Sequence, residues 1–436
     1  MKEVIRSADP RVAALIQRQA TQSRDGDQLG LDRVAALLDR LERPQDRLPP
    51  LLHVAGTNGK GSTCAFLRAA LEAAGLRVHA FTSPHLVRYN ERIRIAGKLI
   101  EDENLAELMA RVLDANDDIG ASLFEVNTAV AFLAFAETPA DACILEVGLG
   151  GRLDATNVVQ KPLVCGIASL GLDHQAFLGS SMIEVAAEKA GIAKRGVPLV
   201  TQLYPSTIAS RIAEIAHEAG AIWEPRGLHW DASTRHGRLR YRDSQGELDL
   251  PLPRLPGKHQ ALNAALAVAM LRHQDQLAVP PSALSAAMGW AHWPARLQQL
   301  HGGPLFDMLP RGSELWVDGG HNPSAARLVA EYARKHWTDG LPLVLAFASL
   351  QSKDAAGTLR PFKGIANEVL TLPIEGHEFR APEELAQLAE SMGLPARARA
   401  GLADAMVALR KPARVLVFGS LYLAGEVLAL NGPLPD

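Results

Sequence analysis

The chain has 436 residues, of which 47% are hydrophobic and 21% are charged. This length exceeds what one compact core normally organises, so we expect two domains. The composition is that of an ordinary soluble enzyme rather than a disordered or fibrous chain. The 48 acidic residues nearly balance the 45 basic ones, which leaves a formal charge of −3 without a long run of one sign. A nucleic-acid partner is therefore not favoured.

Cysteine usage and the absence of long apolar runs bear on the compartment. Cys64, Cys143 and Cys165 form no C-x-x-C pair and cannot all pair with one another, so we expect no disulfide framework. The first 20 residues carry acids among their apolar residues, unlike a signal peptide. No later run approaches the roughly 20 apolar residues of a spanning helix. We expect a cytoplasmic protein with no membrane partner.

The first part of the chain alternates short apolar runs with helical patterns. The runs "LLHVAG" and "LRVHAFTS" flank the helical stretch "STCAFLRAALEAAG", and "HQALNAALAVAMLRHQ" is a later helix. Such alternation is typical of parallel strands crossed by helices. Further buried strands are expected at 141–148, 162–169 and 196–202. Segment 222–252 differs, because "GRLRYRDSQGELDLPLP" is typical of a small antiparallel excursion.

A second alternating series follows a stretch rich in proline and glycine at 292–314. Its expected strands are "ELWVDGG", "LPLVLAFASL", "NEVLTLP" and "ARVLVFGS", with helices from about Pro323 and near Pro382 to Met392. The predicted fold class is α/β: a first domain with a mostly parallel sheet, plus a smaller C-terminal Rossmann-like α/β domain. We place the first domain at 1–296, a linker at 297–313 and the second domain at 314–436.

The stretch "HVAGTNGKGSTCAF" lies in a strand-to-helix turn, where free backbone N–H groups and the helix dipole favour an anion. A standard nucleotide loop places four residues between its first glycine and Gly-Lys-Ser/Thr, but only two residues separate Gly56 from Gly59. Lys60 offers a cation for a phosphate, and Ser62 or Thr63 offers a hydroxyl. The alternative is a glycine-rich turn with a solvated lysine. The strand, turn and helix context favours phosphate binding.

Other polar residues follow predicted strands. Glu146 ends a buried strand, at the edge where open α/β sheets bind ligands, so it is a candidate magnesium ligand or else pairs with a lysine. Asp173 and His174 follow another strand, as a metal ligand with its neighbour or as ordinary polar residues. The polar loop after Ser83 is either a solvated edge or part of a site for an anionic substrate.

Six segments in order carry a resemblance to a known family: "HVAGTNGKGST", "SPHLVRYNERIRI", "LEVGLGGRLDATN", "LDH" followed by "LG", "EKAGI" and "DGGHNP". Together they resemble the folylpolyglutamate synthase and dihydrofolate synthase family of the Mur ligase superfamily, in particular its bacterial bifunctional members. The resemblance covers nearly the whole chain. It implies that the first domain is a P-loop-type ATPase domain. It also implies a cytoplasmic, monomeric ligase that uses ATP to add L-glutamate to dihydropteroate, to reduced folates or to both, through an acyl phosphate.

The resemblance also implies roles for matching positions. Catalytic roles fall on Lys60, on His321 and on Lys189, the lysine that the family carbamoylates. The Mg²⁺ ligands, for two ions in the family site, match Ser83, Glu146 and His174. The ATP contacts match Thr57, Asn58, Gly59, Lys60, Gly61, Ser62, Asn263, Arg296 and Asp318. The pteroate or folate contacts match Gln28, Leu29, Gly30, Ser122, Leu123, Phe124, Glu125, Leu153, Asp154 and Ala155.

Plainer interpretations exist for several of these residues. Lys189 is otherwise a solvated helix lysine, Asn263 an amide satisfied on a helix, and Arg296 a surface charge. The pterin residues are otherwise a helix start and an amphipathic helix face. The chain also departs from the family: Gln28 replaces an acidic residue, Ser122-Leu123 replaces a threonine-aromatic pair, and Gly320 stands where alanine is common. The first two departures leave open the balance between the two folate activities.

The chemistry requires cations between two anions, because ATP must phosphorylate a substrate carboxylate before an amine displaces the phosphate. One alternative is a Mur-type peptidoglycan amino-acid ligase, but those enzymes resemble chains with a full nucleotide-sugar domain before the loop, whereas 55 residues precede Gly56. A GTPase-like switch is the other alternative. It requires a guanine-reading N-K-x-D, and the chain contains no Asn-Lys pair.

Overall fold

The computed structural model describes residues 9–23, 29–432 and 434. These residues form two compact units, which are described separately. The larger unit comprises the described residues up to Arg254 together with Lys258–His292. The smaller unit comprises Leu255–Gly257 and the described residues from Trp293 onward.

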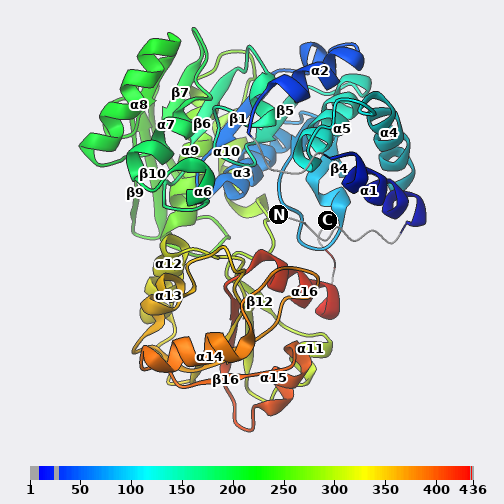
Figure 1. Ribbon diagram of the computed structural model, residues 1–436. Coiled ribbons are helices and arrows are strands. Elements are labelled where there is room, and N and C mark those ends of the chain that lie inside the picture. Colours follow the sequence, from blue (N-terminus) through cyan, green and yellow to red (C-terminus); the bar gives the residue numbers. More distant parts are fainter. Residues whose placement is uncertain (1–8, 24–28, 433, 435–436) are drawn as a thin grey trace. The chain divides into compact units, whose positions relative to one another are not determined.

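The larger unit is built on an eight-stranded sheet with the order β4-β3-β2-β5-β1-β6-β7-β8 (Figure 1). Its strands are β1 (Leu51–Ala55), β2 (Val78–Phe81), β3 (Ile93–Ile95), β4 (Lys98–Leu99), β5 (Ala142–Glu146), β6 (Val164–Ile167), β7 (Pro198–Thr201) and β8 (Ile222–Pro225). A separate three-stranded sheet contains β9 (Trp230–Arg235), β10 (Arg238–Asp243) and β11 (Gly246–Pro251).

Helices and short 3-10 turns connect these strands. The α-helices are α1 (Pro10–Gln22), α2 (Asp32–Arg40), α3 (Lys60–Ala73), α4 (Asp102–Ala115), α5 (Leu123–Glu137), α6 (Gln175–Leu178), α7 (Met182–Ala190), α8 (Ser206–Ala219), α9 (Lys258–Arg272) and α10 (Pro281–Trp290). The 3-10 turns are η1 (Pro44–Arg47), η2 (Tyr89–Arg92) and η3 (Ala155–Val158).

Strand β1 lies inside the sheet and determines where the loops meet. All five of its residues are buried, as expected for an apolar strand of a parallel sheet. It pairs in parallel with β5 and with β6, in a register that sets Val54 opposite Glu146 and Ala55 opposite Ile167. Strand β2 joins β5 in parallel as well. The loops after β1, β2, β5 and β6 therefore leave the same edge, where open α/β sheets bind ligands.

The segment 222–252 is only partly the antiparallel excursion that the sequence predicted. Strand β8 instead joins β7 in parallel and extends the main sheet, with Leu199 opposite Trp223. The antiparallel part is the meander of β9, β10 and β11. The prediction was wrong for β8 because its residues are only partly buried and carry no continuous apolar run to signal a parallel strand.

Apolar side chains on the helices cover the main sheet. One core joins Val12 of α1, Leu108 of α4 and Phe132 of α5 to strand residues such as Leu145. Another joins helices α7 and α8 to β6 and β7. Helix α3, which begins at the glycine loop, packs against α9 and α10. The helix that starts at the loop is therefore held from two sides.

The smaller unit has a six-stranded sheet with the order β12-β13-β17-β14-β15-β16, parallel except for β12 (Figure 1). The strands are β12 (Gln298–Leu300), β13 (Glu314–Val317), β14 (Leu343–Phe347), β15 (Ala366–Thr371), β16 (Ala396–Ala398) and β17 (Arg414–Phe418). The helices are α11 (Pro304–Asp307), α12 (Pro323–His336), α13 (Ala355–Leu359), η4 (Arg360–Phe362), α14 (Pro382–Ser391), α15 (Leu402–Ala408) and α16 (Leu421–Asn431). Residues 297–313, predicted as a linker, include β12 and α11.

Apolar residues of α12, β14 and β17, with Phe362, form the core of the smaller unit. In the part of the chain that the structure describes, each helix is too short or too polar to cross a bilayer.

Candidate functional site

The glycine loop turns from β1 into α3 through backbone conformations that require glycine. Gly59 lies in the left-handed region at φ 86°, and Gly56 is at φ 149°. A Cβ at Gly56 would lie 2.9 Å from the Cβ of Ala168, which is closer than packed carbon atoms approach. Glycine at these positions thus lets the loop lie directly against the segment after β6.

The two residues inside the shortened loop are tied to that segment. The backbone N–H groups of Thr57 and Asn58 donate to the carbonyl of Ser169, at 2.8 and 3.1 Å. The Thr57 hydroxyl donates to the carbonyl of Gly171 at 2.9 Å. The compact loop is therefore held by strand-like contacts and does not need the extra residues of the standard form.

The first turn of α3 supplies the groups that a phosphate needs. The ammonium of Lys60 lies over the loop and donates to the carbonyl of Gly56 at 3.1 Å. Ser62 is 1% exposed, and its hydroxyl has no hydrogen-bond partner within the described residues. A buried hydroxyl without a partner is costly, so it indicates a ligand atom at this position. Helix N–H groups without intrahelical partners add to the anion site.

Asn263 of α9 lies against the loop. Its amide occupies the space beside Gly59: a Cβ at Gly59 would be 2.9 Å from the Asn263 Cγ. The same side chain donates to Gln260 at 3.1 Å within the helix. The interpretation as an amide satisfied on its own helix is thus partly right, but the structure also places Asn263 beside the phosphate loop.

The carboxylate of one predicted metal ligand, Glu146, contacts the backbone of another, Ser83. Glu146 is the last residue of β5 and is buried, and its Oε2 accepts the backbone N–H of Ser83 at 3.2 Å. Glu146 also lies near α3, since burial and the charge of Glu146 together raise the pKa of the Cys64 thiol. A carboxylate and a serine oxygen suit Mg²⁺, which prefers hard oxygen ligands.

His174 precedes α6 in a left-handed conformation at φ 50°, with its backbone N–H on Asp173 at 2.8 Å. Among residues 9–23, 29–432 and 434, no group of three His, Cys, Asp or Glu side chains is arranged to hold a metal. The predicted set contains two such residues and a serine, so it stays a prediction.

Lys189 is not the solvated helix lysine of the plainer interpretation. It is 4% exposed, and its ammonium donates to the carbonyl of Gly150 at 3.4 Å. Burial, and then the charge of Lys60, lower the pKa of Lys189 to about 7, while Asp154 and Asp173 oppose that shift. The plainer interpretation was wrong because the sequence does not show that the loop around Gly150 covers this helix. The structure therefore brings both predicted catalytic lysines into one electrostatic field.

The residues at the start of α5 form a capping box. Ser122 and Glu125 bond each other's backbone N–H groups, and Glu125 also accepts from Arg33 of α2 at 3.0 Å. The ring of Phe124 covers Gly148 so closely that a Cβ there would lie 2.7 Å from the Phe124 Cε2 and clash with the ring, and the ring packs on Phe81. Leu123 offers its carbonyl to Gln19. This helix start thus lies beside the glycine-rich loop after β5.

Asp154, Leu153 and Ala155 end that loop. Asp154 is 2% exposed and accepts from the N–H groups of Leu149 and Thr156, at 2.8 and 3.0 Å. Burial raises the pKa of Asp154, and these hydrogen bonds oppose the rise. Leu29 and Gly30 are half-buried before α2, and a Cβ at Gly30 would meet open space. Gln28 lies outside the described residues.

In the smaller unit, Asp318 follows β13 and is buried. Its two oxygens accept from the N–H groups of Leu297 and Gly320, at 2.9 and 2.8 Å. Burial raises the pKa of Asp318, against the opposing charge of Arg296. Arg296 is half-buried, so it is more than a surface charge, and it donates to the carbonyl of Ala295 at 2.9 Å.

His321 and Gly320 complete this turn. His321 places its Nδ1 3.1 Å from the carbonyl of Gly319. The departure at Gly320 has a local reason, because a Cβ there would lie 2.7 Å from the ring of Phe418. Glycine therefore accommodates a bulky ring under the turn that carries Asp318 and His321.

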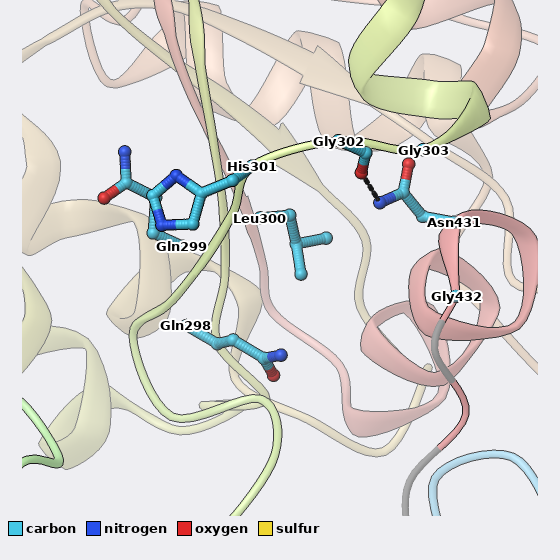
Figure 2. Close-up of a pocket in the computed structure, with 8 residues that line it drawn as sticks. All are labelled: Gln298, Gln299, Leu300, His301, Gly302, Gly303, Asn431 and Gly432. Atoms are coloured by element: carbon cyan, nitrogen blue, oxygen red, sulfur yellow. Dashed lines mark hydrogen bonds between the residues drawn. The ribbon is translucent and has the colours of Figure 1, made fainter.

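Figure 2 shows a cavity of about 560 Å³ on the smaller unit. It is lined by Gln298, Gln299, Leu300, His301, Gly302, Gly303, Asn431 and Gly432. Asn431 closes one side, and its amide donates to the carbonyl of Gly302 (Figure 2). None of these residues is among the predicted site residues.

Sequence reasoning missed His53. This residue lies in the middle of β1, is 0% exposed, and places its Nε2 2.8 Å from the hydroxyl of Thr156. A histidine inside the apolar run "LLHVA" was the available signal, since a buried polar group needs a partner. Nothing in the sequence identified Thr156 as that partner.

The central parallel strand, the glycine turn, the lysine and the buried serine at a helix start define a P-loop-type nucleotide-binding α/β protein. No protein-family model matches the chain. The chain is 34% identical over 430 residues to the dihydrofolate synthase/folylpolyglutamate synthase of Escherichia coli, covering 98% of this chain and 97% of that one. It is 32% identical over 427 residues to the dihydrofolate synthetase of Saccharomyces cerevisiae, covering 93% and 98%. The chain belongs to the dihydrofolate synthase/folylpolyglutamate synthase family.

Solved structures agree. E. coli FolC in complex with DHPP and ADP matches with a TM-score of 0.86 and 34% identity, over 97% of each chain. A bifunctional folylpolyglutamate synthase/dihydrofolate synthase with Mn, AMPPNP and L-glutamate bound matches with a TM-score of 0.83 and 31% identity, over 98% of this chain and 99% of that one. The predicted family and the predicted α/β fold class are confirmed.

Proposed function

We propose that this protein is an ATP-dependent ligase that joins L-glutamate to dihydropteroate and to reduced folates through an acyl phosphate. The observation that carries the proposal is the first turn of α3, where Lys60 and the partnerless hydroxyl of Ser62 follow the compact glycine loop. That loop lies in a chain matched along nearly its whole length by enzymes with this activity. The peptidoglycan ligase alternative is not favoured, because these relatives are folate enzymes.

The residues of the larger unit perform distinct tasks in this reaction. The backbone N–H groups at the start of α3, Lys60 and Ser62 bind the phosphates of ATP and stabilise the charge that develops as the γ-phosphoryl group moves to the substrate carboxylate. Asn263, which lies against Gly59, fixes the loop and contacts the nucleotide. The amine of glutamate then attacks the acyl phosphate, a C–N bond forms and phosphate leaves.

Mg²⁺ fits the oxygen donors of the larger unit. Glu146 and Ser83 would hold it through oxygen atoms and His174 through a ring nitrogen, and the partnerless Ser62 hydroxyl lies in the same helix turn as Lys60. When bound, Mg²⁺ screens the repulsion between the γ-phosphate and the substrate carboxylate. We assign ATP and Mg²⁺, with two ions, as the cofactor set, which the ADP, AMPPNP and Mn complexes of the relatives support.

We assign Lys189 as a carbamoylated lysine that supports the metal site. Its burial and its pKa of about 7 favour the neutral amine, the form that adds CO2 and releases a proton. The carbamate would place an anion beside the cation of Lys60, which attracts it.

The folate side is proposed to contain Gln28, Leu29, Gly30, Ser122, Leu123, Phe124, Glu125, Leu153, Asp154 and Ala155. The packing of Phe124 on Gly148 supports this assignment, because it joins the start of α5 to the loop that leads to Leu153. We propose that Asp318 and His321, from residues 314–436, take part in nucleotide binding and catalysis. Arg296, from the adjoining segment, is proposed to join them. We further propose that the protein is a cytoplasmic monomer of 46.8 kDa. Light scattering measures its mass in solution.

The test is glutamate-dependent ADP release by the purified protein with dihydropteroate or a reduced folate. Lys60→Met should lower kcat/KM by at least about 100-fold, because the variant loses a cation at the transferring phosphoryl group. Lys98→Met, which removes an exposed lysine of β4, serves as the matched control. Undiminished turnover of a folded Lys60→Met would refute the role of the loop. Absence of turnover by the wild-type protein with either substrate would refute the proposed activity.

A further inference from the structure

A chain of three buried polar side chains connects the central strand to the loop after β5. His53 of β1, Thr156 of η3 and Asp154 are 0%, 0% and 2% exposed. The His53 Nε2 lies 2.8 Å from the Thr156 hydroxyl oxygen, and that hydroxyl lies 2.5 Å from the Asp154 Oδ1. Buried polar groups are retained when they satisfy one another.

The direction of the hydrogen bonds follows from the donors. Both carboxylate oxygens of Asp154 already accept backbone N–H groups, from Leu149 at Oδ2 and from Thr156 at Oδ1, and the Thr156 hydroxyl donates to Oδ1 as well. The single hydroxyl hydrogen of Thr156 therefore points at Asp154. The hydroxyl oxygen is left to accept a hydrogen from His53, so the imidazole carries its proton on Nε2.

The surroundings keep the imidazole in this one form. Burial, and then the charge of Lys194, lower the pKa of His53 to about 3, so the ring is neutral at working pH. Lys194 itself donates to the carbonyl of Asn157 at 3.1 Å, one residue beyond Thr156. The Asn157 amide holds the carbonyls of Arg152 and Gly191, at 3.0 and 3.1 Å. Hydrogen bonds thus hold Arg152, Thr156 and Asn157 of this segment, and His53 is the partner on the central strand.

His53 lies in β1, so the chain of side chains that it begins starts close to the phosphate loop. Three residues after His53 the chain enters the phosphate loop at Gly56, while Asp154 ends the loop whose residues Leu153 to Ala155 are assigned to the pterin. One strand therefore orients both the nucleotide loop and the side chain of Asp154.

We propose that His53 is a positioning residue for the pterin side of the site, acting through the Thr156 hydroxyl to fix the orientation of Asp154 and its loop. The proposal rests on the proposed function, which assigns Asp154 to substrate binding. It predicts that breaking the chain weakens pterin or folate binding selectively, because the phosphate loop keeps its own contacts to Ser169.

Two pairs of variants test the proposal on the full-length protein. Thr156→Val removes the hydroxyl at constant shape, and Thr156→Ser restores it. His53→Leu removes the donor, and His53→Gln restores a donor at similar reach. Each broken variant should raise KM for dihydropteroate or folate about tenfold, with KM for ATP within about twofold, and each conservative variant should recover most of the loss. His53→Leu combined with Thr156→Val should be no worse than either alone, because both break the same chain.

Thr371→Val is the matched control, since it removes a buried threonine hydroxyl that bonds Pro382 in the smaller unit. Its KM values should not change. Equal increases in KM for ATP, glutamate and folate in Thr156→Val would show a merely structural role and overturn the proposal, as would an unchanged folate KM in the folded variant. If His53→Leu does not fold, the comparison of Thr156→Val with Thr156→Ser tests the proposal. If the wild-type protein is inactive with both dihydropteroate and folate, the proposed function itself is refuted, and the inference is refuted with it.

Discussion

The ammonium of Lys189 is nearly excluded from water and lies within the field of a second cation, Lys60. Such a site disfavours the protonated amine. The folded-state pKa of about 7 lies below the usual value of 10.5, so the unfolded chain binds more protons between these two pH values. The contribution of Lys189 to stability is therefore least favourable below pH 7 and improves as the pH rises from 7 towards 10.5.

The variant Lys189→Met should remove this dependence. In CO2-free buffer we expect it to be more stable than the wild type at pH 6, by on the order of 3 kcal/mol, and the difference should shrink by pH 10. Urea unfolding of both proteins across this range measures it. A difference that does not vary with pH would contradict the assignment of Lys189 as a disfavoured buried cation.

The same pair of proteins tests the carbamate. Carbon-13 NMR with labelled bicarbonate should show a carbamate signal in the wild type that is missing from Lys189→Met. Turnover should fall by at least about 100-fold in the variant, so the residue is retained for its chemistry although it weakens the fold.

At the scale of elements, the three-stranded sheet braces the helix that carries Asn263. Arg272 at the end of α9 makes two hydrogen bonds of 2.6 Å to Asp243 of β10, and Tyr241 donates to the same carboxylate at 2.9 Å. The Asp243 side chain is 1% exposed. Removing one partner of a buried pair leaves the other charge uncompensated.

Asp243→Ala should therefore lower the free energy of unfolding by about 3 kcal/mol. The same sheet offers a control, because Arg238 and Asp249 form an ion pair whose side chains are 44% and 56% exposed. Asp249→Ala should cost less than about 1 kcal/mol. Chemical denaturation compares the two variants, and equal losses would argue that the sheet does not brace α9 through Asp243.

Elements that carry a continuous apolar run or a clear period were predictable from the sequence. Strands β1, β5, β14 and β17, whose residues are all buried, lie inside the predicted segments. Strand β8 was not predictable as part of the main sheet, because it is an edge strand with mixed residues. A local sequence pattern thus identifies strands that are buried on both faces, but not strands at the edge of a sheet.

For the candidate site, the sequence showed which residues follow strands but not which side chains touch. The contact of Asn263 with Gly59 joins residues about 200 positions apart, and no spacing rule reaches that far. The resemblance supplied Asn263 and Lys189 by position, and the structure supplied the packing of Asn263 and the burial of Lys189. The chain from His53 through Thr156 to Asp154 came from the structure alone, because neither the residue spacing nor the resemblance pointed to it.

At the scale of the whole molecule, the range of substrates is the main question. The chain is almost equally similar to a bifunctional bacterial enzyme and to a yeast dihydrofolate synthetase. Overall identity therefore does not decide between one activity and two. The decision lies in local residues such as Ser122 and Leu123, which depart from the threonine-aromatic pair.

We expect both activities in one protein. Turnover measured separately with dihydropteroate and with reduced folates should show glutamate-dependent ADP release with each, within about 100-fold of one another in kcat/KM. Activity with only one of the two substrates would contradict bifunctionality and leave the ligase assignment intact. Leu123→Tyr, which restores an aromatic residue, should shift the ratio of the two kcat/KM values.

The three cysteines have a practical consequence. Cys64, Cys143 and Cys165 are buried free thiols, all in the larger unit, and burial raises the pKa of each. Thiolates, and not thiols, react with alkylating reagents. Alkylation therefore requires the larger unit to open, so the alkylation rate reports the opening of that unit alone. Nucleotide bound at the start of α3 should lower the alkylation rate at Cys64 first.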